Sequence, residues 1–354
     1  MRLCHIHCGP HKTGSSSLQR SLQVNRLYLA ARGFVVPAVS DTRFAVDSHL
    51  LLAGELPQLA AGPTGRLTDR PPAWTRLARQ LQGGSAVPLL SSEIFSLHFL
   101  KEATVNAVTG FLHMLGYRAH FIYYIRDNPA WLNSLYVQET KRFYTALAFE
   151  PYIEAAFGRA RFDYGALLRH VSGNPAAMLT AIPFEPATRS GLLDAFLAAV
   201  TAAEGLPPLA GLSGLAGLAG LIGLIEAARA NPNAGVKAVH VGRTVADLLA
   251  ARGLNPRAHR DLYGQFKQTY RARRWTDDPY CGLNDALAAR IVARYQPRND
   301  RLAQALWGNP WSEVIAPAPG FRENHLGIAT DPPRDLRDMD ATLQHLRAMI
   351  DAIP

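Results

Sequence analysis

Hydrophobic and polar positions along the first 185 residues alternate between short apolar runs and longer helical patterns. Short apolar runs that alternate with helices are typical of a parallel α/β sheet, in which the strands are buried on both faces. The runs predict strands over Leu3–Cys8, Ala86–Leu90, Arg118–Ile125 and Met178–Ile182. Pro88 weakens the second prediction, because proline cannot donate a hydrogen bond to a neighbouring strand.

The helical patterns predict the remaining elements. One helix is expected from Ser15 to Arg32, where Gly33 ends it, and another is expected to begin with Asn128 as N-cap and Pro129 as its first residue. The C-terminal half predicts helices over Val241–Arg252, Asn284–Tyr295, Asp300–Trp307 and Met339–Ile353. We therefore expect an α/β fold, a three-layer parallel sheet flanked by helices, with a helical C-terminal part.

The segment Leu206–Ile225 is uncharged and carries a glycine at every third position over part of its length. It is long enough to span a membrane, but its glycines weaken a helix and no basic residue flanks it closely. We expect an insertion rather than a span, and membrane contact there stays an alternative. The expected divisions are a core over 1–205, a Gly/Leu-rich insertion or linker over 206–235, a helical part of the same domain over 236–316, and a C-terminal loop and helix over 317–354.

Composition narrows the class of protein. Among 354 residues, 48% are hydrophobic and 18% are charged, which excludes a wholly disordered chain. The net charge of +9 comes mainly from arginine, which suits anion recognition, but the arginines are spread along the chain and a nucleic-acid partner is not expected. Three cysteines without metal-ligand spacing and the lack of a signal-peptide pattern predict a cytoplasmic protein without a metal.

The segment from Gly9 to Ser17 joins the first predicted strand to the first helix. The N–H groups and the positive dipole end of a helix N-terminus attract phosphate or sulfate, and Lys12 adds a point charge. The residues expected to contact such an anion are Gly9, His11, Lys12, Thr13, Gly14, Ser15, Ser16 and Ser17. The alternative is a Gly-Pro turn followed by a serine-capped helix.

Other anion-binding loops do not match this segment. In a Walker A loop the lysine follows the second glycine, whereas Lys12 precedes Gly14. A phosphotyrosine-phosphatase loop needs arginine six residues after its cysteine, and Gly14 stands at that distance from Cys8. A Rossmann fingerprint needs three spaced glycines.

The Lys12-Thr13-Gly14-Ser15-Ser16 run resembles the 5′-phosphosulfate loop of sulfotransferases that use 3′-phosphoadenosine 5′-phosphosulfate (PAPS). A second motif of that family is an arginine at a strand end with a serine eight residues on, and here Arg126 is followed at that spacing by Ser134. Asn128, which separates Asp127 from Pro129, departs from the family pattern. The resemblance covers about residues 1–185 and returns weakly at 295–303.

This resemblance implies a P-loop NTPase-like sulfotransferase fold, similar to bacterial and glycan or heparan-type enzymes. It implies that residues 13–17 hold the 5′-phosphate, that Lys12 neutralises charge on the leaving nucleotide, and that Arg126 and Ser134 hold the 3′-phosphate. The implied co-substrate is PAPS, the product is 3′-phosphoadenosine 5′-phosphate (PAP), and no metal is required. The acceptor would be a hydroxyl or amine of a glycan, glycolipid or small metabolite.

An acceptor hydroxyl needs a general base. Glu93, directly after the second predicted strand in Ser91-Ser92-Glu93, resembles the glutamate base of heparan N-sulfotransferase-type enzymes. His98 and His113 are the alternatives, because aryl and steroid sulfotransferases use histidine.

Two other functions remain open. One is an ATP-dependent small-molecule or sugar kinase with an irregular phosphate loop, and the other is a non-catalytic nucleotide- or glycan-binding protein. Lys267 and the residues 271–275 could close over the nucleotide, grip an anionic acceptor, or form a solvated helix face. Trp131, Tyr136 and Tyr144 could stack on a ligand or belong to the core. Acceptor identity and oligomeric state have no sequence signal.

Overall fold

The computed structural model describes residues 1–39, 49–62, 69–207, 234–317, 320–324 and 333–353. Its contacts group the chain into two compact units. The first comprises Met1–Arg126, Ala160–Ala230 and Pro297–Ala316, and the second comprises Asp127–Arg159, Asn231–Gln296 and Pro317–Pro354. Each unit combines segments that are far apart in the sequence. The expected domain boundaries near residues 205, 235 and 316 stay predictions.

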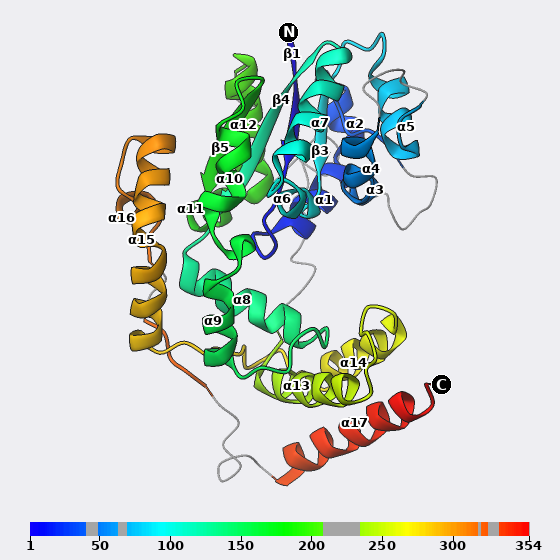
Figure 1. Ribbon diagram of the computed structural model, residues 1–354, viewed down its shortest axis with the longest axis vertical. Helices are drawn as coiled ribbons and strands as arrows, with labels where there is room; N and C mark the ends of the chain where they lie inside the picture. Colours follow the sequence, from blue (N-terminus) through cyan, green and yellow to red (C-terminus); the bar gives the residue numbers. More distant parts are fainter. Residues whose placement is uncertain (40–48, 63–68, 208–233, 318–319, 325–332, 354) are drawn as a thin grey trace, which may run out of the picture. The chain divides into compact units, whose positions relative to one another are not determined.

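The first unit is built on a five-stranded parallel sheet in the order β2-β3-β1-β4-β5 (Figure 1). The strands are β1 (Arg2–His7), β2 (Phe34–Val35), β3 (Val87–Ser91), β4 (Tyr117–Ile125) and β5 (Ala177–Pro183). The predicted α/β class, a parallel sheet flanked by helices with a helical C-terminal part, is confirmed. The four predicted strands are found to within one residue at each end.

The edge strand β2 was not predicted, because two residues are too few to form an apolar run. The Val87 N–H donates to the Gly33 carbonyl on the β2 side of β3, so the nitrogen of Pro88 faces the other side, toward β1. The pairing of β3 with β1 begins only at Leu89, opposite His5, so Pro88 lies just before that ladder and its missing N–H is tolerated there.

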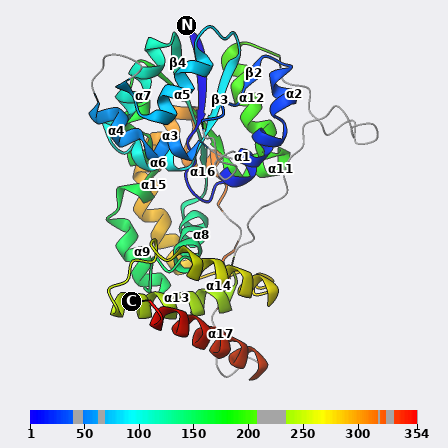
Figure 2. The same ribbon diagram turned by 90° about the vertical axis from the view of Figure 1, so that its right-hand side faces the viewer.

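Helices cover both faces of the sheet (Figure 2). On one face, apolar side chains of α1, α2 and α12 form a core with Ile122 and Tyr124 of β4. On the other face Phe99, which follows α6, stacks edge-on against Phe121 of β4 with ring centroids 5.0 Å apart. The helices of this unit are α1 (Ser15–Val24), α2 (Arg26–Ala30), α3 (Leu50–Gly54), α4 (Leu56–Ala61), α5 (Pro72–Leu81), α6 (Ile94–His98), α7 (Glu102–Met114), the 3₁₀ helix Ala160–Phe162, α10 (Tyr164–Ser172), α11 (Phe184–Ser190), α12 (Leu192–Glu204) and α16 (Trp311–Val314).

The helix expected from Ser15 to Arg32 is two helices, which meet at Asn25. The Asn25 side chain donates a hydrogen bond of 2.6 Å to the carbonyl of Ser21. Such side-chain bonds compete with the helical ladder and favour a break. Gly33 then adopts φ 83°, as expected of the glycine that follows a helix.

The N-cap of α8 (Asn128–Thr140) is Asp127, not Asn128 as predicted. The Asp127 carboxylate accepts a hydrogen bond of 3.5 Å from the Ala130 N–H, and its extended backbone lies outside the helix. Aspartate and asparagine are comparable caps, so composition alone did not separate them.

A second correction concerns α15 (Asp285–Trp307), which is one helix where two were expected. It continues through Pro297, because the buried residues Ile291, Tyr295, Asn299 and Ala303 are four apart and form one continuous stripe.

The second unit is helical. It contains α8, α9 (Phe149–Phe157), α13 (Val236–Ala251), α14 (Arg260–Ala272), the first part of α15, and α17 (Pro333–Asp351). Gly242 of α13 lies against the end of α8, where a β-carbon would be 2.7 Å from the Thr140 carbonyl oxygen. Helix α17 begins earlier than the predicted Met339.

Most of the predicted insertion, 208–233, lies outside the described residues, and so does most of Leu206–Ile225. Within the part of the chain that the structure describes, no helix has the length and apolar character needed to cross a membrane.

Candidate functional site

The carboxyl ends of β1 and β3 are neighbours, with His7 opposite Ser91. The helices that follow these strands cover opposite faces of the sheet: α1 packs beside Tyr124, and Phe99 after α6 packs on Phe121. In open α/β sheets, ligands bind at the carboxyl edge where the connections diverge in this way. The loop from Gly9 to Ser17 and the residue Glu93 both lie at this point of the edge.

The loop is anchored to the sheet before it turns. The Cys8 N–H donates to the Ile122 carbonyl at 2.9 Å, and the Tyr124 N–H donates to the Gly9 carbonyl at 3.1 Å. Gly9 has φ 81°, and a β-carbon there would lie 2.9 Å from the Cα atom of Glu93. Glycine is therefore required at this position for its backbone conformation and for the close approach to Glu93.

The turn that follows has left-handed backbone at Lys12 (φ 70°) and at Gly14 (φ 76°), on either side of Thr13. The Thr13 hydroxyl is buried and donates a hydrogen bond of 2.6 Å to the Pro10 carbonyl. Turns that place successive N–H groups in this way form concave anion sites. A non-glycine residue in left-handed backbone is strained, and such strain is concentrated at functional sites.

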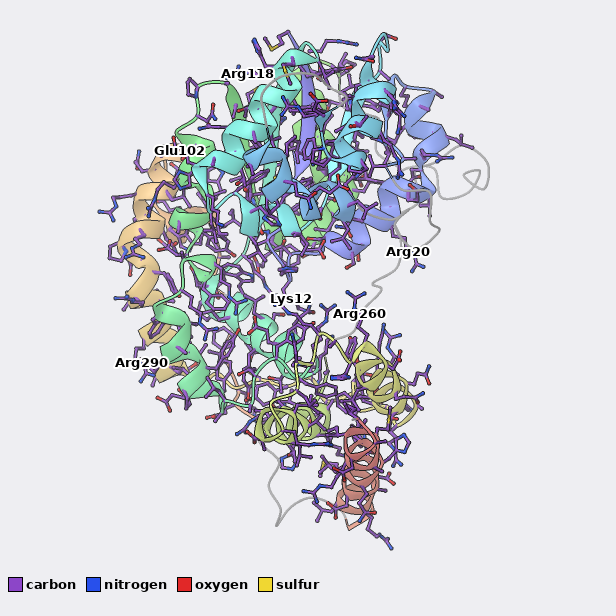
Figure 3. All side chains as sticks on the ribbon, turned by 45° about the vertical axis from the view of Figure 1, so that its right-hand side comes forward. Lys12, Arg20, Glu102, Arg118, Arg260 and Arg290 are labelled. Carbon is purple, nitrogen blue, oxygen red and sulfur yellow. The ribbon has the colours of Figure 1, made fainter. Side chains whose placement is uncertain are left out.

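Helix α1 begins directly after this turn, at Ser15, without a capping side chain and without an acidic residue in its first turn. No carboxylate of that turn competes with an anion for the positive end of the helix. Figure 3 shows Lys12 beyond the carboxyl ends of the strands. Among the predicted anion-binding residues, Gly9, Thr13 and Ser15 are buried, His11, Lys12, Gly14 and Ser17 are half-buried, and Ser16 is exposed.

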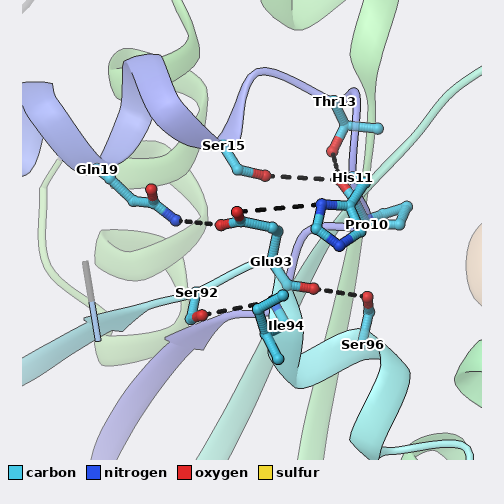
Figure 4. Close-up of polar contacts among 9 residues, drawn as sticks. All are labelled: Pro10, His11, Thr13, Ser15, Gln19, Ser92, Glu93, Ile94 and Ser96. Atoms are coloured by element: carbon cyan, nitrogen blue, oxygen red, sulfur yellow. Dashed lines mark hydrogen bonds and ion pairs between the residues drawn. The ribbon is translucent and has the colours of Figure 1, made fainter. Parts of the chain in front are cut away.

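Glu93 lies beside this loop, although it is distant in sequence (Figure 4). Its Oε2 atom accepts a hydrogen bond of 2.7 Å from Gln19 of α1, and its Oε1 atom is 4.0 Å from Nδ1 of His11. Glu93 occupies the N-cap position of α6, but its side chain does not cap that helix. A carboxylate that is held by Gln19 and one quarter exposed can accept a proton from a group that approaches from solvent.

Arg126 follows β4 at the same edge. Its Nε atom is 3.3 Å from Oε1 of Glu185, and its guanidinium lies 5.4 Å from the Phe184 ring centroid. The backbone N–H of Arg126 donates to the Tyr164 hydroxyl. Phe184 also lies 3.3 Å from where a β-carbon of Gly14 would be. Phe184 therefore contacts both the loop and Arg126.

The other predicted site residues belong to other elements. Ser134 is buried on α8 in the second unit, whereas Arg126 ends a segment of the first. Of the alternative bases, His98 is half-buried on α6, where burial and then Lys101 lower its pKa, and His113 is exposed on α7. Trp131 and Tyr136 are buried, and Tyr144 is 42% exposed.

Neither of the buried side chains at the end of β1 has the character of a nucleophile or a strong base. Burial lowers the pKa of His7 to about 4, against the opposing effect of Glu93, so its ring is neutral near pH 7. Burial also raises the pKa of the Cys8 thiol well above its usual value, and its Sγ donates to the Ile6 carbonyl. Both residues are structural parts of the strand end.

Sequence reasoning did not assign Gln19, Phe184 or Glu185 to the site. Gln19 stands one turn after Ser15 on α1, and the other two directly follow Pro183, the last residue of β5. The rule that ligands bind past the carboxyl ends of strands would have pointed to Phe184 and Glu185.

No family model, curated protein or solved structure matches this chain. Among the described residues, no group of three or more His, Cys, Asp or Glu side chains is arranged to hold a metal ion.

Proposed function

We propose that the chain is a PAPS-dependent sulfotransferase with a P-loop NTPase-like sulfotransferase fold. The observation that carries the proposal is the left-handed turn at Lys12 and Gly14, next to the carboxylate of Glu93, where β1 and β3 end. An anion-binding turn, a cation and a candidate base lie there within one short stretch of the sheet edge.

The donor would bind through its two phosphate-bearing groups. The residues 13–17 would hold the 5′-phosphate, and Lys12 would lie at the bridge between phosphate and sulfate. Arg126, at the end of β4, would hold the 3′-phosphate. The proximity of Phe184 to both Gly14 and Arg126 supports a donor that spans the loop and the end of β4.

In the reaction, the acceptor oxygen would form a bond to sulfur while the bond from sulfur to the bridging oxygen of PAPS breaks. The acceptor proton would pass to the Glu93 carboxylate, and PAP would leave with the electrons of the broken bond. Lys12 would stabilise the negative charge that develops on the bridging oxygen. Catalysis of this kind relies on positioning and charge stabilisation, as in phosphoryl transfer.

Isothermal titration calorimetry with PAP, and separately with ATP and magnesium, tests the proposal. We expect PAP to bind more tightly than ATP with magnesium, and Arg126→Ala to weaken PAP binding by about tenfold or more, since a charge-assisted contact contributes about 1.5–3 kcal/mol. Arg118→Ala is the matched control, because Arg118 lies at the opposite end of β4, where it donates to the Ala177 carbonyl. It should leave PAP binding unchanged.

Three outcomes would contradict the proposal. A preference for ATP with magnesium would favour a kinase. Tight PAP binding that is equally weakened by Arg118→Ala and Arg126→Ala would remove Arg126 from the nucleotide site. If PAP binds as expected but no acceptor is turned over, a non-catalytic binding protein becomes the better description.

A further inference from the structure

One face of α14, in the second unit, carries polar and cationic side chains. Tyr263, Lys267 and Arg271 are four residues apart and therefore lie along the same side of the helix. Tyr270, directly before Arg271, is buried, and burial raises the pKa of its hydroxyl. This face borders the apolar side of the helix, on which Phe266 is buried.

The turn after α8 brings a further cation to this face. Phe143, in left-handed backbone with φ 63°, packs against Phe266 with ring centroids 5.4 Å apart. This contact holds the neighbouring Arg142, whose guanidinium lies 5.7 Å from the Tyr263 ring centroid. The Nε atom of Arg142 is buried and has no hydrogen-bond partner.

The cations in this group lie close enough to repel one another. The pKa of Lys267 is lowered by burial and then by the charges of Arg271 and Arg142. Among the described residues, no carboxylate pairs with Lys267 or Arg142. Arg142 and Lys267 are half-buried, and like charges in such a place are unfavourable until an anion compensates them.

Some arginines of the second unit are compensated by carboxylates. Arg290 lies 2.9 Å from Glu150 and 2.6 Å from Glu154, and Arg274 lies 2.9 Å from Asp277. Carboxylates therefore compensate cations in this unit, but no ion pair among the described residues involves Arg142 or Lys267.

We propose that Arg142, Lys267 and Arg271 bind an oxyanion, the sulfate or phosphate ester of an acceptor molecule. The guanidinium groups offer paired N–H donors that match the oxygens of such an ester, and Lys267 adds a point charge. The ring of Tyr263 is an apolar surface beside them. The role as an acceptor site rests on the proposed sulfotransferase function, whereas anion binding itself does not.

Calorimetry of the full chain with a heparin-derived tetrasaccharide, and with its desulfated counterpart, tests the site. We expect Lys267→Gln and Arg142→Gln each to weaken binding of the sulfated tetrasaccharide by about tenfold. Arg290→Gln, which removes a compensated cation of the same unit, should bind as the native chain does. Because Lys267→Gln removes repulsion, its melting temperature should equal or exceed the native value, which excludes a loss of fold as the cause.

The proposal is overturned if Arg290→Gln weakens binding as much as Lys267→Gln, or if the desulfated tetrasaccharide binds equally well. Titration with PAP separates donor from acceptor. Weaker PAP binding by Lys267→Gln would assign the cluster to the donor and overturn the acceptor role. If the native chain binds no PAP but its tetrasaccharide binding still depends on Lys267, the anion site is supported and the sulfotransferase proposal fails.

Discussion

The backbone of Gly9 passes so close to Glu93 that a β-carbon on Gly9 would lie 2.9 Å from the Cα atom and 3.0 Å from the Cβ atom of Glu93. Two segments that are far apart in the sequence are therefore fixed against each other at the edge of the sheet. Any side chain at Gly9 must displace either the start of the anion loop or the residue proposed as base.

Gly9→Ala should destabilise the protein more than a glycine substitution that meets only backbone strain. Gly116→Ala is the matched control, because Gly116 has φ 82° and open space around its β-carbon position. We expect the control to cost about 1 kcal/mol and Gly9→Ala a further 1–3 kcal/mol or so, because alanine at Gly9 also overlaps Glu93. Urea unfolding measures the free energy of unfolding of both variants. Equal decreases in the two variants would contradict the close approach of Gly9 to Glu93.

Glu93→Gln should abolish turnover while leaving PAP binding nearly unchanged. The amide oxygen of the new side chain can still accept the hydrogen bond from Gln19, so the site keeps its geometry but loses its base. We expect a decrease in kcat of about 100-fold or more. Glu102→Gln, at the start of α7, removes a carboxylate elsewhere in the same unit and should leave kcat unchanged. Comparable turnover in both variants would remove Glu93 from the role of base.

The strands and the anion loop could be predicted from the sequence because each is defined by a contiguous stretch. The apolar run of β4 is buried along nearly all of its length, and the loop combines a lysine, glycines and hydroxyls between a strand and a helix. Local composition determines such elements strongly.

The partners of the site residues could not be predicted in this way. The contact of Gln19 with Glu93 depends on β1 and β3 being neighbours with His7 opposite Ser91. No local pattern specifies that register, because it follows from how the helices pack on the two faces. The Arg126–Glu185 pair likewise depends on β4 and β5 ending at the same level.

The Arg126–Glu185 pair gives a third prediction. The Glu185 carboxylate pairs with the Arg126 guanidinium, which is proposed to bind the 3′-phosphate. The negative charge of Glu185 would also repel that phosphate. Glu185→Gln should therefore strengthen PAP binding by about two- to fivefold, the range expected for a partly exposed ion pair. Calorimetry with PAP measures the change. Weaker binding would mean that Glu185 orients Arg126 rather than competing with the ligand.

His5 of β1 and His120 of β4 form a hydrogen bond of 2.7 Å between their Nδ1 atoms inside the first unit. His5 Nε2 is also 3.0 Å from the Glu204 carboxylate, and His120 Nε2 is 2.7 Å from the Thr180 hydroxyl. With Glu204 ionised, all three bonds are satisfied when both rings are neutral: Thr180 donates to His120, His120 to His5, and His5 to Glu204. Burial favours the same neutral state.

The stability of the protein should decrease as the pH falls below about 6.5, because its buried histidines resist protonation. Burial lowers the pKa from 6.5 to about 3 for His5 and to about 4 for His7, His49 and His120. Between those values and 6.5 the unfolded chain binds more protons than the folded chain, so acid favours unfolding. Each histidine contributes at most about 1.4 kcal/mol per pH unit to the slope, and Glu204, whose pKa burial raises, opposes it. Urea unfolding from about pH 7 to about pH 5 measures the slope. A free energy of unfolding that stays constant over this range would show that these rings are not held neutral.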